Sequence, residues 1–355
     1  MERSPDADLA KHLAEAVRAA RADNRSLYLR GGDSKRVRYG RRCDAADLDV
    51  SGHRGIVSYR PAEMVITARS GTPISELVAA VDEAGQRLAF DAPTCGGRAT
   101  LGGSLACNAS GPARPWLGSV RDAVLGLRLV DGGGQLLRFG GEVIKNVAGY
   151  DVSRLQAGAL GTLGLITEVS LRLLPKPETR LCLTRSCELD AAIPCLREVA
   201  LEALPLSGAC WYDGALRLRF EGSSAAMRAL RARFADWAPD DDGFWTRLRE
   251  GALPGLERPH IRADLAAATA AAALADTWLI DWAGSLRLLP EPVDDLPLAE
   301  HAASTRAQVQ LCGYGDQERE VFPAPKPAMR HVLQRTKQAA DPGAVFNPGR
   351  LYEWM

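Results

Sequence analysis

The sequence predicts an α+β protein of two domains. Its 355 residues are roughly twice a common domain length of about 150. Glycine is concentrated in residues 85–164, which hold 17 of the 34 glycines, whereas residues 176–335 hold only 9. Five of the seven tryptophans lie in that second stretch. We place the first domain at residues 1–175 and the second at 176–335, because Pro175 and Pro177 end a strand and favour an extended linker.

Helices and strands alternate at the start of the chain. The first helix is predicted to begin at Ser4 and to carry an apolar stripe at helical spacing: Leu9, Leu13 and Val17. A strand over residues 26–30 runs directly into a glycine-rich loop, residues 31–35. A second amphipathic helix begins after Pro73 and ends at Gly85, since glycine readily takes the left-handed conformation that closes a helix.

The middle of the chain is loop-rich and then forms strands. Residues 93–118 are small and polar, and a bound ligand explains this run better than packing does. Residues 124–139 predict a hairpin that turns at residues 131–134. Alternation of apolar and polar side chains predicts a half-buried strand over residues 165–173.

The second domain is predicted to contain a hairpin, a helix and a strand rich in tryptophan. The hairpin spans residues 211–216, and the helical stripe runs from Met227 to Trp237. Trp278, Ile280 and Trp282 alternate as in a strand, so burial accounts for these aromatic side chains without a cofactor.

Composition excludes several classes of function. Lys plus Arg and Asp plus Glu both number 44, and no basic stripe suited to nucleic acid is present. No uncharged apolar run reaches the roughly 18 residues that span a bilayer, and the charged N-terminus predicts no signal peptide. The eight cysteines include no Cys-x-x-Cys pair and the five histidines have no metal-ligand spacing, so we expect reduced thiols, no metal site and no iron–sulphur cluster in this chain.

Three glycine-rich loops, within residues 31–35, 93–111 and 158–164, are the strongest indication of function. Each ends a strand or begins a helix, so their backbone N–H groups can point at one anion, and a dinucleotide pyrophosphate is the natural candidate. Ordinary turns explain residues 132–134 but not three separate loops. The spacing matches neither the triphosphatase loop nor the Rossmann fingerprint.

The order of these motifs resembles the FAD-binding domain of the vanillyl-alcohol oxidase/PCMH family. The matching segments are Gly31–Lys35, Pro93–Gly111, Lys145–Asp151 and Gly161–Thr167, and the resemblance returns at Phe346–Arg350. Within that family, residues 145–155 are most similar to the FAD-binding subunits of glycolate oxidase complexes. The resemblance implies a PCMH-type FAD-binding domain of two subdomains, a smaller α+β cap domain, and a C-terminal segment, residues 336–355, that returns to the first domain.

The resemblance also implies which residues hold FAD. The first two loops would cradle the pyrophosphate and the third would line the adenosine or flavin side. Asp33 stands where the family often has a third glycine, and aspartate tolerates the left-handed backbone. Attachment is expected to be non-covalent, because the loops carry no histidine and only Cys95 or Cys107 could serve. The implied cofactor residues are Gly31, Gly32, Asp33, Ser34, Lys35, Pro93, Gly97, Thr100, Gly102, Gly103, Asn108, Ser110, Gly111, Gly161, Thr162, Gly164 and Ile166.

The catalytic residues for oxidising a 2-hydroxy acid stay unknown from sequence. Such a reaction needs a base for the hydroxyl proton and a cation for the carboxylate. Related single-chain dehydrogenases supply clustered histidines from the second domain, and this chain has no such cluster. His260 with Arg262 is the nearest local pair, and a surface strand end accounts for it equally well.

The resemblance implies a subunit that works inside a complex. A larger FAD-containing subunit would oxidise glycolate and an iron–sulphur subunit would carry electrons onward, with this chain as a relay or second flavin site. Two alternatives stay open: a self-sufficient FAD-dependent 2-hydroxy acid dehydrogenase, and a non-catalytic structural subunit with an empty FAD fold. We expect the chain in the cytoplasm, peripheral to the inner face of the cell membrane through the complex.

Overall fold

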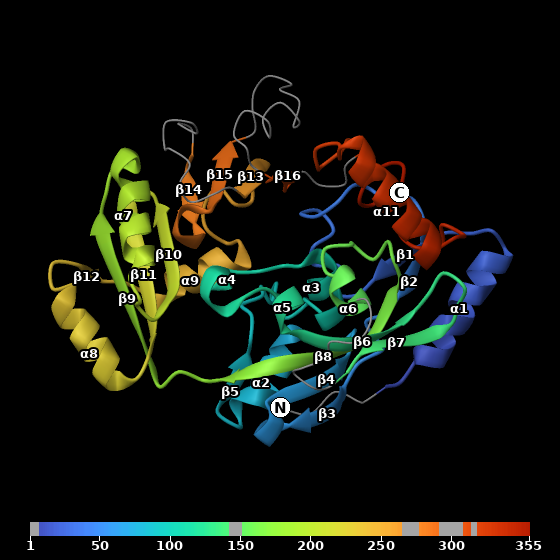
Figure 1. Cartoon of the computed structure of the whole chain (residues 1–355), viewed down its shortest axis with the longest axis horizontal. Coiled ribbons are helices and arrows are strands. Elements are labelled where there is room, and N and C mark those ends of the chain that lie inside the picture. Colours follow the sequence, from blue (N-terminus) through green and yellow to red (C-terminus); the bar gives the residue numbers. More distant parts are fainter. Residues whose placement is uncertain (1–6, 142–150, 265–276, 291–307, 314–317) are drawn as a thin grey trace. The chain divides into compact units, whose positions relative to one another are not determined.

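The computed structural model describes residues 7–141, 151–264, 277–290, 308–313 and 318–355 (Figure 1). Contacts divide the chain into two compact units. The first contains residues 1–109, 119–175 and 315–355, and the second contains residues 110–118 and 176–314. The second of these units therefore takes up the chain again at Lys176. The return to the first unit comes at residue 315 rather than 336, and residues 110–118 belong to the second unit because Trp116 packs against that unit's core.

The first unit carries two sheets and most of the short helices. Its strands are β1 (Leu27–Arg30), β2 (Ala46–Asp49), β3 (Ile56–Arg60), β4 (Val65–Arg69), β5 (Gln86–Leu88), β6 (Val124–Val130), β7 (Leu136–Gly140) and β8 (Leu165–Pro175). Its helices are α1 (Ala10–Ala22), the 3-10 helix η1 (Pro61–Glu63), α2 (Ile74–Asp82), α3 (Leu101–Cys107), α5 (Val120–Ala123), α6 (Val152–Leu155) and α11 (Pro327–Ala340).

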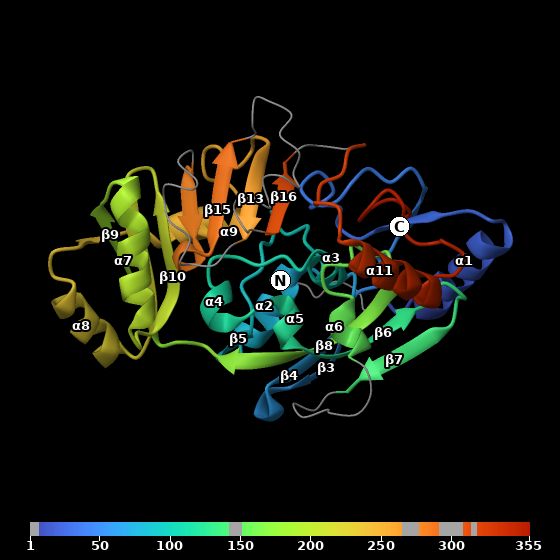
Figure 2. The same ribbon diagram turned by 45° about the horizontal axis from the view of Figure 1, so that its top comes forward.

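The larger sheet of this unit has the order β3-β4-β8-β6-β7, with β5 also paired to β8. Its main core joins β4, β6 and β8 to α2, α3 and α5, which are drawn close together in both ribbon views (Figures 1 and 2). The expectation of a half-buried strand at 165–173 is wrong: β8 is buried at nearly every position through Leu173, because side chains of β4 and β6 also cover its polar residues, as Thr67 does for Ser170. Leu101 and Leu105 are also fully buried, so the small-residue run does pack.

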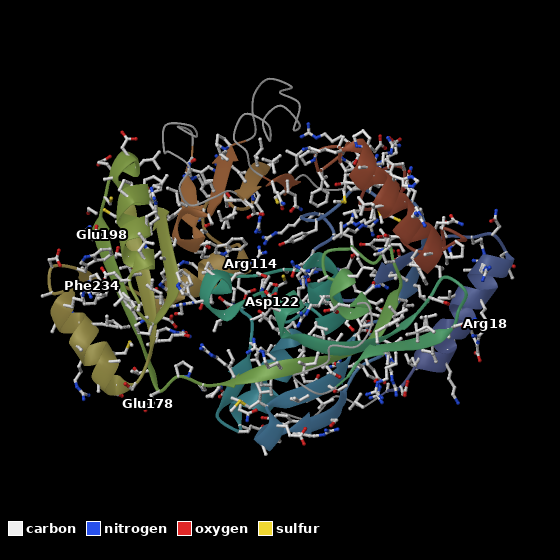
Figure 3. The ribbon with its side chains drawn as sticks, in the orientation of Figure 1. Arg18, Arg114, Asp122, Glu178, Glu198 and Phe234 are labelled. Atoms are coloured by element: carbon white, nitrogen blue, oxygen red, sulfur yellow. The ribbon has the colours of Figure 1, made fainter. Side chains whose placement is uncertain are left out.

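The smaller sheet pairs β1 with β2 in parallel, and Phe346 bridges to Leu27 from the far end of the chain. Helix α1 packs Leu13 and Val17 into the same core as Phe346. The helix begins at Ala10, later than the predicted start; Ser4 lies outside the described residues. Arg18, labelled in Figure 3, donates a 2.7 Å hydrogen bond to the carbonyl oxygen of Gly134 in the predicted hairpin turn.

The second unit is built on an eight-stranded sheet of order β12-β9-β11-β10-β14-β15-β13-β16. Its strands are β9 (Thr179–Ser186), β10 (Leu206–Tyr212), β11 (Ala215–Gly222), β12 (Ala238–Pro239), β13 (His260–Asp264), β14 (Leu279–Asp281), β15 (Leu286–Pro290) and β16 (Gln308–Cys312). Its helices are α4 (Arg114–Leu117), α7 (Leu189–Leu201), α8 (Ser224–Arg233), α9 (Asp242–Glu250) and the 3-10 helix η3 (Trp282–Gly284).

Aromatic side chains fill this second unit, as their spacing predicted. The hairpin β10–β11 turns at Asp213 and Gly214. The predicted tryptophan strand is shorter than expected, because Trp282 leaves β14 for η3 with a left-handed φ of 53°. Its indole N–H donates to the carbonyl oxygen of Gly111 at 3.1 Å, and the guanidinium of Arg114, labelled in Figure 3, lies 4.5 Å from the ring centroid. None of the helices in the described ranges is both long and apolar enough to cross a membrane.

Candidate functional site

One cavity in the first unit collects the predicted glycine loops. The empty space that it encloses is about 780 Å³, a figure that includes open solvent at its mouth. Its lining comes from the end of β1, the loop after it, α3, the turn before β8 and the C-terminal segment. The lining residues are Tyr28, Leu29, Gly31–Arg36, Val50, Ser70, Thr100, Gly102, Gly103, Ala106, Cys107, Leu160, Gly161, Gly164–Ile166, Asn347 and Arg350.

The loop of residues 31–35 offers backbone donors to this cavity. A Cβ on Gly32 would lie 1.6 Å from the carbonyl oxygen of Arg98, and one on Gly31 would lie 2.6 Å from Thr100 Oγ1. Only glycine allows so close an approach. Within the described part of the chain, the N–H groups of residues 31–35 donate no hydrogen bond. Because buried or half-buried donors are normally satisfied, this row indicates an acceptor outside the protein.

Asp33 takes the left-handed conformation that the sequence anticipated, with φ of 50°. Its carboxylate accepts a 3.1 Å hydrogen bond from the Tyr28 hydroxyl and lies 3.8 Å from the Arg36 guanidinium. Burial raises the pKa of Tyr28, and the neighbouring Asp33 adds to that increase. The charge of Asp33 is thereby offset locally, and the loop tolerates a carboxylate beside the cavity.

Two buried cations line the cavity without a carboxylate partner. Lys35 is 7% exposed and donates only a 3.4 Å hydrogen bond to Ser104 Oγ. Arg350 is 5% exposed and donates to the carbonyl oxygens of Arg36, Tyr39 and Arg41. Among the described residues, neither side chain forms an ion pair. A buried charge without a counter-charge is costly, so the cavity is suited to an anion.

The charges of Lys35 and Arg350 also act on the neighbouring Cys107 thiol. Burial raises its pKa, and the positive charges of Lys35 and Arg350 partly oppose that increase. Ser70 adds a polar atom: its Oγ is buried and has no hydrogen-bond partner in the described chain. A ligand that bonds to this hydroxyl would satisfy it.

Helix α3 contributes space rather than donors. The N–H of Leu101 donates to Thr72 at 2.9 Å and that of Gly102 to Ser70 at 2.8 Å, both to carbonyl oxygens. The N–H of Gly103 donates to Thr100 Oγ1 at 3.3 Å. A Cβ on Gly102 would lie 2.7 Å from the Ser70 Cβ. The expectation that this loop grips an anion through its backbone therefore fails for these amides, because they already bind the protein.

The C-terminal segment supplies two lining residues that sequence analysis did not assign. Asn347 accepts a 2.7 Å hydrogen bond from the Leu29 N–H and donates to the carbonyl oxygen of Leu160 at 2.6 Å. It thereby joins β1 to the turn at Gly161, where a Cβ would lie 2.6 Å from Asn347 Nδ2. The motif Phe346–Arg350 was noticed, and only its place in the fold shows that Asn347 and Arg350 reach the cavity.

Six of the predicted cofactor residues do not line this cavity: Pro93, Gly97, Asn108, Ser110, Gly111 and Thr162. Gly97 and Asn108 take left-handed turns, with φ of 81° and 46°. Ser110 and Gly111 belong to the second unit. Thr162 is fully buried and its hydroxyl donates to Ala159 at 2.7 Å. Lys145–Tyr150 lie outside the described residues.

His260 and Arg262 both lie on β13 in the second unit. The Arg262 guanidinium binds Asp264 at 3.1 and 3.3 Å and lies 4.7 Å from the Trp282 ring centroid. His260 Nδ1 lies 2.8 Å from the carbonyl oxygen of Arg258, and the ring meets Trp278 edge-on. These contacts give both side chains a structural role within the strand, and they add no support for catalysis.

Comparison with known proteins supports an FAD domain. Residues 7–140 match the family model described as an FAD binding domain. The chain is 42% identical to the glycolate oxidase subunit GlcE of Escherichia coli K12 over 98% of both chains. It is 36% identical to the glycolate oxidase subunit GlcD of Bacillus subtilis 168 over 38% of this chain and 29% of that protein.

A solved alkyldihydroxyacetonephosphate synthase is similar in fold, with a TM-score of 0.68 at 15% identity, covering 98% of this chain and 76% of that one. The PCMH-type α+β fold inferred from the glycine loops is thereby confirmed. The chain belongs to the family of the glycolate oxidase subunit GlcE, a family of FAD-dependent oxidoreductases, and its cofactor is FAD.

Proposed function

We propose that this chain is the FAD-binding subunit of a multi-subunit glycolate oxidase, holding its FAD non-covalently in the cavity of the first unit and passing electrons to an iron–sulphur partner. The observation that carries the FAD site is the pair of buried, carboxylate-free cations, Lys35 and Arg350, in one cavity. Two separate positive groups suit a diphosphate bridge, which carries two negative charges.

The residues present fit that cofactor. The free N–H groups of residues 31–35 would bind phosphate oxygens, as successive amides do in other anion sites. The hydroxyl of Ser70 would find its missing partner. The lining also includes apolar side chains, Leu29, Val50, Leu160 and Ile166, suited to the flat faces of aromatic rings. Bound FAD supplies a two-electron acceptor.

The surroundings of His260 and Arg262 favour a relay over a self-sufficient dehydrogenase. Binding a 2-hydroxy acid needs a cation for its carboxylate and a base for its hydroxyl proton. His260 and Arg262 do not offer this base and this cation. The Arg262 guanidinium is paired with Asp264, and the His260 ring contacts a carbonyl oxygen. Substrate oxidation is therefore assigned to a companion subunit, and activity is expected only in the complex.

The test begins with the chain purified alone. The proposal predicts that the isolated chain shows a flavin spectrum and that denaturation releases its FAD into solution. Glycolate added under anaerobic conditions should not bleach the flavin. Co-expression with the companion subunits should restore glycolate oxidation, and removal of this chain should abolish it. Bleaching of the isolated chain by glycolate would establish a self-sufficient dehydrogenase, and a colourless chain that binds no added FAD would establish a structural subunit.

A further inference from the structure

Helix α11 presents a face that the described chain does not cover. Only Lys337 of its 14 residues is buried. Met329 and Val332 are 54% and 56% exposed and lie three residues apart, so they adjoin on one side of the helix. A helix of this length is marginal in water and normally relies on packing for its stability.

Two basic residues flank this face, because Lys326 lies three residues before Met329 and Arg335 three residues after Val332. From Val321 to Ala340 the sequence contains Lys326, Arg330, Arg335 and Lys337 and no Asp or Glu, in a chain whose charges otherwise balance. Lys337 is satisfied internally. Among the described residues, Lys326 and Arg335 form no ion pair, and Arg330 contacts the Trp354 ring at 5.1 Å from its centroid.

We propose that α11 docks an acidic surface with an apolar centre on a companion protein subunit, with Met329 and Val332 at the middle of the contact and Lys326 and Arg335 at its rim. Arginine and methionine are enriched at protein interfaces, and complementary charges speed and orient association. A lipid surface fits less well, because membrane-binding helices bury several large apolar side chains and this face offers only two. The partner class rests on the proposed function, while the surface itself does not.

The underside of α11 connects this surface to the FAD cavity. Lys337 Nζ donates to Asp341 Oδ2 and to the carbonyl oxygen of Thr162, both at 2.7 Å, and to that of Phe346 at 2.9 Å. Thr162 and Phe346 directly neighbour the lining residues Gly161 and Asn347. A partner bound to α11 would therefore contact a helix that is hydrogen-bonded to the two segments lining the cavity.

The experiment co-expresses a tagged form of the full chain with the companion subunits and measures their recovery and association constant. We expect Lys326→Glu/Arg335→Glu and Met329→Ser/Val332→Ser each to weaken association about 100-fold. Wild-type association should weaken as salt rises. Matched controls alter exposed residues elsewhere: Lys11→Glu/Arg228→Glu for charge and Val78→Ser/Leu155→Ser for apolar contact. They should associate as the wild type does.

The flavin spectrum of each isolated variant separates this inference from the proposed function. Every α11 variant should keep its flavin, since none of the four residues lines the cavity. Unchanged companion recovery by both α11 variants would overturn the docking surface even if FAD is bound. Binding to phosphatidylglycerol vesicles that only the α11 variants lose, with companion recovery intact, would overturn it in favour of a lipid surface.

Discussion

Two buried cations, Lys35 in the first unit and Arg219 in the second, have opposite surroundings. In the second unit, Arg219 is 6% exposed, bonds to Ser207 Oγ at 3.0 Å and to its carbonyl oxygen at 2.8 Å, and lies 5.0 Å from the Trp245 ring centroid. Among the residues that the structure describes, Lys35 in the first unit has one hydrogen bond, at 3.4 Å, and pairs with no carboxylate.

This difference separates structural charges from ligand-binding ones. A buried cation whose donors bind the protein stabilises the fold, and it acts on a ligand chiefly through its charge, as Arg350 does in the cavity. A buried cation left incomplete costs stability, and such a cost persists where a function requires it. The predictions below test that distinction, beginning with the largest effect.

Replacing Gly32 by valine should remove FAD from the chain. The Cβ would fall 1.6 Å from a backbone oxygen, so the loop must move and its free N–H groups lose their alignment. We expect FAD affinity to fall at least about 100-fold, measured by titrating the apoprotein and following the flavin spectrum. Gly214→Ala, at a left-handed turn of the second unit with open space around it, should cost stability and leave FAD affinity intact. Equal losses in both variants would contradict the assignment.

Lys35→Met and Arg219→Met should have opposite consequences. Removing Lys35 is expected to weaken FAD binding by about 1.5–3 kcal/mol and to leave the apoprotein at least as stable, because an unpaired charge is lost. Removing Arg219 should lower the free energy of unfolding by about 2–3 kcal/mol with FAD affinity unchanged. Denaturant unfolding of the apoproteins and FAD titration measure both. A marked loss of apoprotein stability in Lys35→Met would show that Lys35 is structural.

Two serines give a smaller version of the same contrast. Ser70→Ala removes a buried hydroxyl that has no partner in the described chain, so only FAD affinity should change, by about 0.5–1.5 kcal/mol. Ser207→Ala removes the acceptor of the Arg219 guanidinium, so only the free energy of unfolding should change, by about 1 kcal/mol. If FAD binds Ser70→Ala as tightly as the wild type, the hydroxyl does not face the cofactor.

His53 predicts a modest dependence of stability on pH. Burial lowers its pKa, although Asp8 partly opposes the change. The folded chain then binds fewer protons than the unfolded chain, so this contribution is present above about pH 6.5 and is lost as pH falls below it. Melting temperatures between pH 7.5 and 5.5 measure the effect. His53→Gln should flatten that profile, while replacing exposed His12 should not; an unchanged slope in His53→Gln would refute the role.

Sequence reasoning found the loops because they are local. The row Gly31–Lys35 follows its strand as predicted, and the left-handed Asp33 matches what aspartate tolerates. Sequence reasoning failed where residues distant in the chain decide the burial or the hydrogen-bond partner of a group. The expectation for β8 was wrong because alternation cannot reveal that side chains of neighbouring strands cover its polar residues: Ser170 bonds to Thr67, and Glu168 pairs with Arg128. The backbone N–H groups at the start of α3 were assigned to an anion, yet they donate to the carbonyl oxygens of Ser70 and Thr72.

The sequence by itself determined where the backbone turns tightly and approaches other chain segments, since glycine and aspartate encode those conformations within a few residues. Tertiary structure alone decided which charges meet. Lys35 and Arg350 come from opposite ends of the chain and line one cavity. Arg262 instead pairs with Asp264 and lies over the Trp282 ring. The physical reason is range: a backbone conformation depends on its own residue, but the environment of a charge depends on every side chain that folding brings to it.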